Sequence, residues 1–178
     1  GVTGVQTCAL PIFDNLLDNS IRLRLRSDVP VGSSLSGGLD SSTMLYYINK
    51  HKKNHSTFSA LFPGYEKDES EFVKMVCHSF QVDNKSATPT ALEMINDFEK
   101  LLYHQEEPFS SSSVYAQYRV MRLAKENGIK VLIDGQGADE VFAGYHKYIH
   151  WFLQEKVNRR QFGQLLHEMN NFKSNGVK

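Results

Sequence analysis

The apolar positions of this chain follow two alternating periods. Segments with apolar residues three and four apart predict amphipathic helices, and short apolar runs bounded by glycine, proline or polar residues predict strands. Helices are expected over residues 13–25, 39–50, 68–80, 90–103 and 114–126, from residue 138 onward, and at the start of residues 154–178. Strands are expected over residues 29–35, 57–62, 85–87 and 129–133. Because strands and helices alternate, the pattern predicts an α/β fold of parallel βαβ units with right-handed crossovers.

Two glycine-rich segments come directly after predicted strands. Ser36–Ser42 reads SGGLDSS and follows the first strand, whereas Asp134–Glu140 reads DGQGADE and follows the last one. In parallel α/β folds, ligands bind beyond the carboxyl ends of the strands. Both segments are therefore expected at the functional site.

The first segment has the composition of a phosphate cradle. Its glycines allow the backbone N–H groups to approach an anion closely, and the helix that follows adds the positive end of its dipole. The spacing does not match G-x-x-x-x-G-K-[ST], because Gly38-Leu39 stands where Lys-Ser/Thr is required. An aspartate here would repel phosphate unless a metal lies between them, so Asp40 predicts a bridging Mg²⁺. The alternative is a helix N-terminus at which Asp40 and the serines only act as caps.

The second segment carries acids at the start of a predicted helix. Asp139 and Glu140 follow Gly135 and Gly137, which again allow close backbone approach after a strand. One interpretation is that these acids complement the helix dipole. The interpretation favoured here makes Asp139 the second carboxylate of the metal site.

Composition excludes several classes of protein. The chain has 178 residues, enough for one domain, and its 20 Lys+Arg balance its 20 Asp+Glu. Neither a nucleic-acid backbone nor an anionic membrane is therefore an expected partner. No apolar run reaches the roughly 20 residues of a membrane span. The only cysteines, Cys8 and Cys77, cannot form a disulfide scaffold, so a reducing, cytoplasmic location is expected.

The first twelve residues do not fit the pattern of the rest. They lack the basic start of a signal peptide and resemble translated sequencing-adapter DNA joined to a gene fragment. Residues 1–12 are thus expected to be an artefact, or alternatively a disordered arm, and residues 13–178 a partial domain.

Together, the two glycine-rich motifs resemble the synthetase domain of glutamine-hydrolysing asparagine synthetases. The SGGLDSS motif alone is shared by the wider group of ATP pyrophosphatases, which includes synthetases of GMP, NAD and argininosuccinate. The resemblance extends from about Phe13 to about Tyr148 and includes further segments: Arg24–Gly32, Thr57–Ala60, Asp68–Ser70, Glu107–Phe109 and Phe142–Tyr145. It implies a three-layer α/β/α fold of the ATP-pyrophosphatase type, also called adenine-nucleotide alpha-hydrolase-like.

The resemblance also implies a reaction. Such ligases use ATP to adenylate the side-chain carboxylate of aspartate with release of pyrophosphate, and ammonia from glutamine then gives asparagine and AMP. It implies Mg²⁺ ligands at Asp40 and Asp139, and catalytic roles for Asp40, Asp139 and Gln136. It places ATP and pyrophosphate at Ser34, Leu35, Ser36, Gly37, Gly38, Asp40, Ser41, Ser42, Ala60, Asp134 and Gly135.

Three departures from the family pattern qualify this expectation. Gln136 stands where many members carry an acid, and a neutral amide cannot act as a base near pH 7. Ser34 stands where an apolar residue is usual. The glutaminase domain and the later part of the synthetase domain have no counterpart here, so the fragment itself is expected to be inactive. Two alternatives remain, a related enzyme such as a β-lactam-forming synthetase and a catalytically incomplete nucleotide-binding module.

One aromatic group is left over by this assignment. Tyr145, Tyr148, Trp151 and Phe152 gather near the end of the family resemblance. Core packing is the first interpretation of this group, and a contact between domains or within a homodimer is the second.

Overall fold

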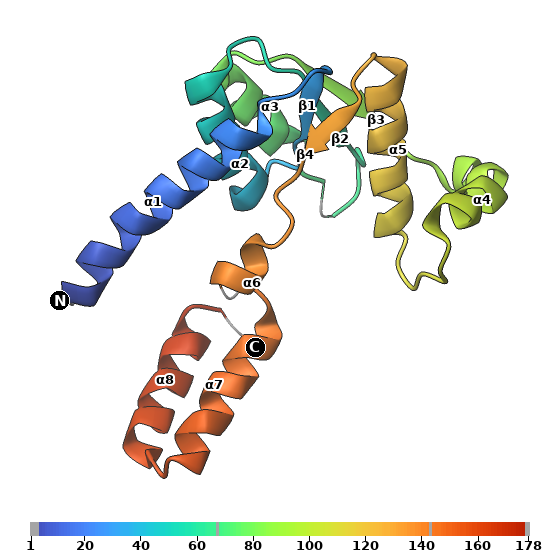
Figure 1. Cartoon of the computed structure of the whole chain (residues 1–178). Coiled ribbons are helices and arrows are strands. Elements are labelled where there is room, and N and C mark those ends of the chain that lie inside the picture. Colours follow the sequence, from blue (N-terminus) through green and yellow to red (C-terminus); the bar gives the residue numbers. More distant parts are fainter. Residues whose placement is uncertain (1–3, 67, 143, 177–178) are drawn as a thin grey trace. The chain divides into compact units, whose positions relative to one another are not determined.

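The computed structural model describes residues 4–66, 68–142 and 144–176. The chain divides into two compact units, residues 1–135 and residues 136–178, which are described separately (Figure 1). The first unit contains a sheet with its covering helices, and the second contains helices.

The sheet of the first unit has four parallel strands. They are β1 (Val31–Ser34), β2 (Thr57–Ala60), β3 (Asn84–Ala87) and β4 (Val131–Ile133), in the spatial order β3-β2-β1-β4. The order reverses direction at β1, because the chain first adds strands on one side of β1 and then returns to its other side. The carboxyl ends of β1 and β4 therefore form a topological switch point, where such sheets bind ligands.

Helices cover both faces of this sheet. The first unit contains α1 (Gly4–Arg24), α2 (Leu39–His51), α3 (Ser70–Phe80), α4 (Ala91–Gln105) and α5 (Ser113–Glu126). Helices α1, α2 and α3 lie on one side of the sheet and α5 on the other (Figure 1). This arrangement confirms the three-layer α/β/α fold.

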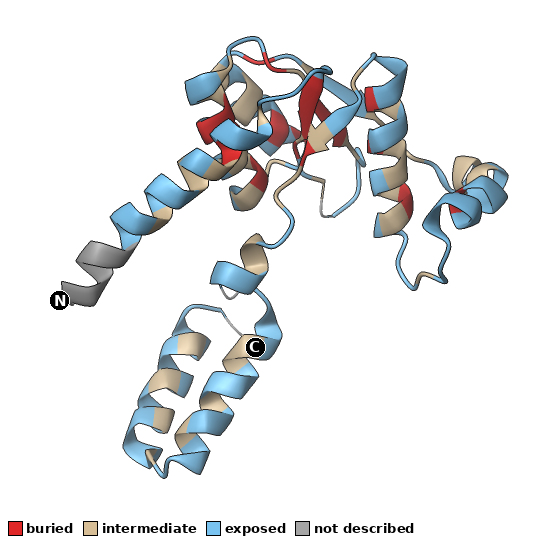
Figure 2. Cartoon of the chain, in the orientation of Figure 1, coloured by how far each residue is buried: buried red, intermediate tan, exposed pale blue. Residues whose placement is uncertain are grey.

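The buried core consists of three apolar clusters that hold the helices to the sheet. Ile21 of α1 and Ile48 of α2 pack with Val31 and Ile133, which come from neighbouring strands. A second cluster joins α2 to α3 through residues Leu35, Leu45, Val73 and Val82. On the opposite face, Phe58 packs against Val120 and Ala124 of α5. Figure 2 shows these buried positions on the strands and on the helix faces that cover them.

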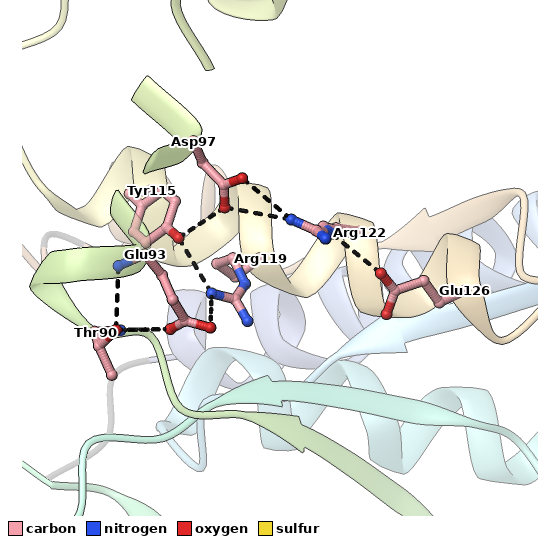
Figure 3. Close-up of polar contacts among 7 residues, drawn as sticks. All are labelled: Thr90, Glu93, Asp97, Tyr115, Arg119, Arg122 and Glu126. Atoms are coloured by element: carbon pink, nitrogen blue, oxygen red, sulfur yellow. Dashed lines mark hydrogen bonds and ion pairs between the residues drawn. The ribbon is translucent and has the colours of Figure 1, made fainter. Parts of the chain in front are cut away.

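Helix α4 is held mainly by polar contacts with α5 (Figure 3). Arg119 of α5 lies 2.7 Å from Glu93 Oε1 and donates to the Tyr115 hydroxyl at 3.1 Å, and that hydroxyl donates to Asp97 at 2.9 Å. Among the described residues of α4, only Leu101 is buried. The network thus supplies much of the contact that fixes α4, and it comprises Thr90, Glu93, Asp97, Tyr115, Arg119, Arg122 and Glu126.

The start of α4 shows why the sequence forms a helix there. Thr90 and Glu93 make a capping box, in which the Thr90 hydroxyl accepts from the Glu93 N–H and the Glu93 carboxylate accepts from the Thr90 N–H. Arg119 and the Thr90 donors hold the pKa of Glu93 below its ordinary value.

The second unit is a set of three helices with little core. It contains α6 (Ala138–Phe142), α7 (His146–Asn158) and α8 (Phe162–Ser174), none of which has a buried residue among those described. The expectation that Trp151 packs in a core is wrong, because its side chain is 55% exposed. Its ring instead contacts that of Tyr148, which is partly buried and contacts the ring of Tyr145, the N-cap residue of α7.

The N-terminal helix is longer than the sequence pattern predicts. Helix α1 begins at Gly4 rather than Phe13 and contains Pro11. Residues 1–3 lie outside the described part of the chain, and the assignment of residues 1–12 as foreign to the domain stays a prediction. Within the described residues, no helix has both the length and the apolar character needed to cross a membrane.

Candidate functional site

The first glycine-rich loop joins the carboxyl end of β1 to the start of α2. Gly38 is the N-cap of α2 and makes no side-chain capping bond. The N–H groups of Leu39, Asp40 and Ser41 have no acceptor within the helix, since they belong to its first turn. They present partial positive charge at the end of the loop, where an anion would be stabilised.

Gly37 allows this loop to turn against α3. Its φ of +88° lies in the left-handed region, and a Cβ at this position would lie 2.8 Å from the Cβ of Phe72 and 2.9 Å from the N of Val73. Both the backbone conformation and the lack of space therefore require glycine. The contact also brings the first turn of α3 beside the loop.

Hydrogen bonds within the loop hold its shape. The Ser41 hydroxyl accepts from the N–H of Ser36 at 3.2 Å and donates to the carbonyl of Gly38 at 3.2 Å. The Ser36 hydroxyl accepts from the N–H of Gly38 at 3.2 Å. Ser41 is buried, whereas Ser36 is exposed. Ser41 thus braces the loop from inside, and Ser36 lies on its accessible side.

The second motif meets the first where β4 ends. The register pairs Ser33 with Ile133, which places Asp134 and Gly135 beside the end of β1. A Cβ on Gly135 would lie 3.4 Å from both the Cβ of Asp40 and the N of Ser41. The start of the second glycine-rich loop therefore packs directly on the first turn of α2, as the sequence predicts.

Asp134 is oriented by two donors. Its carboxylate accepts from the N–H of Gly135 at 2.7 Å and from the side-chain amide of Gln117 in α5 at 3.2 Å. The carboxylate is thereby fixed at the end of β4, next to the loop of β1.

A buried polar chain fixes the strand end that opens the first loop. The Ser59 hydroxyl donates to the carbonyl of Leu35 at 2.5 Å, and the Asn84 amide donates to the Ser59 hydroxyl at 2.9 Å. The N–H of Leu35 donates to the carbonyl of Phe58 at 2.8 Å. Leu35 is thus held through both of its backbone groups, and Ala60 lies at the neighbouring end of β2.

Asp68 links the carboxyl end of β2 to the start of α3. Its Oδ1 accepts from the Ser70 hydroxyl at 2.5 Å, from the N–H of Ser70 at 3.2 Å and from the N–H of Phe62 at 3.4 Å. The Ser70 hydroxyl and these amides hold the pKa of Asp68 below its ordinary value. Asp68 therefore remains ionised, and it positions the helix end that lies against Gly37.

The donor set around this loop fits a phosphate carried with a divalent cation. Within the described residues, the hydroxyls of Ser34 and Ser42 are buried without a hydrogen-bond partner, and the Asp40 carboxylate has neither a hydrogen bond nor an ion pair. The described part of the chain contains no cluster of three or more acids, cysteines or histidines that could enclose a metal by itself. Mg²⁺ is commonly held by one or two carboxylates together with phosphate oxygens, and Asp40 suits that mode.

Gln136 and Asp139 belong to the second unit. Gln136 is exposed and precedes α6, and Asp139 lies in the first turn of that short helix. That these two residues share a site with Asp40 stays a prediction.

Comparison with known families agrees with this geometry. The model of the family described as asparagine synthase matches residues 13–175, which is most of the chain. The chain belongs to the asparagine synthase family.

Among its relatives in the asparagine synthase family, two resemble the chain at 33% identity. One is a glutamine-hydrolyzing asparagine synthetase of Bacillus subtilis (strain 168), matched over 73% of this chain and 20% of the relative. The other is a putative asparagine synthetase of Methanocaldococcus jannaschii, matched over 84% of this chain and 31% of the relative. The chain thus spans a fifth to a third of the length of these relatives.

A solved structure of similar fold is the NH3-dependent NAD synthetase of Campylobacter jejuni. The two share a TM-score of 0.51 at 17% identity, over 74% of this chain and 58% of the synthetase. At this identity the likeness concerns the fold alone, and it agrees with the parallel sheet and flanking helices of the first unit. The asparagine synthase family member described here therefore has an ATP-pyrophosphatase type of fold.

The sequence analysis did not identify the residues whose hydrogen bonds hold the two loops in place. Ser59, Asn84 and Gln117 hold Leu35 and Asp134 in place, yet none of them lies in a glycine-rich motif. The one available signal was the polar pair Asn84 and Ser59 within short parallel strands, where apolar residues are usual. A polar side chain that is buried in such a strand requires a partner.

Proposed function

We propose that this asparagine synthase family chain binds Mg-ATP at the β1/β4 switch point as part of an ATP-dependent, amide-forming ligase. The observation that carries the proposal is the packing of Gly135 on Asp40 and Ser41. This contact brings the start of the second glycine-rich motif, the N-terminus of α2 and the Asp40 carboxylate together at one edge of the sheet. This combination can accept a polyphosphate that carries a divalent cation.

Each part of the site has a distinct role in this proposal. The N–H groups at the start of α2, with the Ser36 hydroxyl, would bind pyrophosphate oxygens. Asp40, together with Asp139 of the second motif, would hold Mg²⁺. The backbone of Leu35 and Ala60 would face the adenine, and Asp134 and Gly135 would lie beside the ribose and α-phosphate. When bound, the Mg²⁺ ion supplies positive charge that stabilises the leaving pyrophosphate.

The reaction proposed for the whole enzyme has two steps. A side-chain carboxylate oxygen of aspartate attacks the α-phosphorus of ATP, and the bond from that phosphorus to the bridging oxygen breaks, so pyrophosphate leaves with the electron pair. Ammonia derived from glutamine then attacks the activated carbonyl carbon and AMP leaves, which gives asparagine after loss of a proton. Gln136 can orient a substrate by hydrogen bonding but cannot take that proton as a base.

The binding step is tested on the chain itself. Titration calorimetry with ATP is expected to show binding that requires Mg²⁺. Asp40→Asn is expected to weaken that binding at least about tenfold, which corresponds to roughly 1.4 kcal/mol. Asp83→Asn, which removes an exposed carboxylate at the start of β3, serves as the control and is expected to bind ATP as the original chain does. Equal affinity in Asp40→Asn, or binding that survives chelation of Mg²⁺, would contradict the proposal.

The reaction is tested on the enzyme extended to the length of its relatives. AMP and pyrophosphate are expected only when aspartate is present, and formation of ADP would reject adenylation. The chain of 178 residues is expected to bind nucleotide without turnover, because it spans only a fifth to a third of the relatives. We place this reaction in the cytoplasm, where ATP and amino acids are made and used.

The second candidate is a nucleotide-binding module without catalysis. It is favoured by one observation, the neutral amide of Gln136 in the loop where many family members carry an acid. Gln136→Glu in the extended enzyme separates the two. If Gln136→Glu turns over much faster than the extended enzyme with Gln136, the inactive module is favoured. If both turn over at comparable, measurable rates, the ligase is favoured.

A further inference from the structure

Gly144 lies against the side chain of Asp139 in the second unit. It follows the short helix α6, and its N–H donates to the main-chain carbonyl of Asp139 at 3.0 Å. A Cβ built on Gly144 would lie 1.9 Å from Oδ1 of Asp139, 2.8 Å from its Cγ and 3.2 Å from its Cβ. No side chain can therefore occupy position 144 while the Asp139 carboxylate keeps this orientation.

The need for glycine at this position comes from space rather than from backbone conformation. The φ of Gly144 lies outside the left-handed region, so the backbone would accept any L-residue. Gly137 shows the opposite case, with a φ of +96° and no heavy atom within 4 Å of a built Cβ. Of the two glycines, Gly144 is the one whose missing side chain determines where a carboxylate lies.

The next residue contacts the other acid of the motif. The Tyr145 hydroxyl donates to Oε1 of Glu140 at 2.9 Å, and this contact raises the pKa of Tyr145. Gly144 and Tyr145 thus fold back on Asp139 and Glu140, respectively. Gly144 and Tyr145 consequently determine where both acidic side chains lie.

We propose that Gly144 is a positioning residue that holds the Asp139 carboxylate in its orientation by leaving it room. The functional part of this inference rests on the proposed Mg-ATP site, in which Asp139 is a ligand of Mg²⁺. Because the obstructing atoms belong to a short side chain that can rotate, Gly144→Ala turns the carboxylate away without breaking the fold. The effect of the substitution therefore falls on metal-dependent binding rather than on stability.

The structural part is tested on the ligand-free chain. In Gly144→Ala, the side-chain couplings and the carboxyl ¹³C shift of Asp139, measured by NMR, are expected to report a different rotamer. Gly163→Ala is the matched control, because no heavy atom lies within 4 Å of a Cβ built there and the same substitution leaves Asp139 untouched. An unchanged Asp139 rotamer in Gly144→Ala would overturn the inference, whatever the outcome for ATP. Should Gly144→Ala unfold, Gly144→Ala combined with Asp139→Ala must restore folding, and persistent unfolding would also overturn it.

The functional part is tested by ATP affinity as a function of Mg²⁺ concentration. Gly144→Ala and Asp139→Asn are each expected to weaken Mg-dependent ATP binding at least tenfold, and the double variant is expected to bind no more weakly than Asp139→Asn. A rotated carboxylate with undiminished ATP affinity would overturn the positioning role. If the original chain binds no Mg-ATP, the proposed function fails, and the rotamer measurement still decides the geometric claim.

Discussion

Replacing Gly37 with alanine tests the packing of the first loop against α3. Alanine must adopt a φ of +88° and place its Cβ 2.8 Å from the Cβ of Phe72 and 2.9 Å from the N of Val73. The left-handed conformation costs about 1–2 kcal/mol, and overpacking against atoms that cannot rotate away costs about 1–3 kcal/mol more. Gly37→Ala is therefore expected to lower the free energy of unfolding by roughly 2–5 kcal/mol and to displace the first glycine-rich loop.

Gly64 provides the control that separates the two contributions. Its φ of +83° is almost the same, but no heavy atom lies within 4 Å of a built Cβ. Gly64→Ala is therefore expected to cost only the conformational part, about 1–2 kcal/mol. Urea unfolding should be followed by circular dichroism and by hydrogen exchange of the sheet amides. The single tryptophan, Trp151, lies in α7 of the second unit, so the sheet amides and not tryptophan fluorescence are followed.

Comparison of Gly37→Ala with Gly64→Ala can contradict the packing argument. Equal destabilisation by Gly37→Ala and Gly64→Ala would mean that the contact between the loop and α3 contributes nothing. Loss of Mg-dependent ATP binding in Gly37→Ala alone would agree with a displaced phosphate loop. Retained ATP affinity in a folded Gly37→Ala would refute the assignment of this loop to the phosphates.

Three further outcomes are expected in other parts of the first unit. Ser59→Ala should destabilise the chain by about 1–3 kcal/mol in urea unfolding, because it removes the hydroxyl that donates to the buried Leu35 carbonyl and one of the two acceptors of the Asn84 amide. An unchanged unfolding midpoint would contradict this. Burial lowers the pKa of His55 from 6.5 to about 4, so the unfolded chain binds a proton there between these pH values and the folded chain does not. The contribution of neutral His55 to stability is therefore present above pH 6.5 and lost as the pH falls toward 4, and His55→Leu should flatten the measured pH dependence over that range. Arg119→Met should speed hydrogen exchange of the α4 amides and leave exchange in the sheet unchanged, with a loss of about 1 kcal/mol in the stability of α4. In the original chain, 0.5 M salt should reproduce part of this effect. Equal exchange of the α4 amides in Arg119→Met and in the original chain would exclude an electrostatic role.

Most elements of the first unit could be predicted from local sequence patterns. Apart from the start of α1, the strands and helices of this unit lie within a few residues of their predicted positions, because short apolar runs, caps and glycines act over only a few residues. The helix boundaries of the second unit could be predicted less well. The sequence predicts a helix from about Ala138 and a helical start of residues 154–178, whereas the chain forms α6, α7 and α8, with a turn at Arg160 that takes a φ of 55°. The turn contains neither glycine nor proline, so it could not be predicted from the sequence.

The supporting residues of the site depend on contacts between distant segments. Ser59 and Asn84 come from different strands, and only the register of β2 and β3 brings them together with Leu35. The role of Gly144 depends on the fold of the segment around α6, since its φ is ordinary and only the position of the Asp139 side chain leaves no room for a Cβ. Sequence motifs identify the residues expected to contact a ligand. The residues that hold those motif residues in place can be identified only from side-chain positions in the structure.

The strand order has a consequence for how this protein is made. Val31 of β1 pairs with Val131 of β4, so β1 leaves the ribosome long before its partner strand has been made. The β1–β2 pair can form early, but the side of β1 that faces β4 remains an open edge until the chain through Ile133 has emerged. Such an edge can pair with other nascent chains, and closing a long loop is slow. The rate at which β4 docks therefore sets both when the proposed nucleotide site can first form and how long the nascent chain is exposed to aggregation.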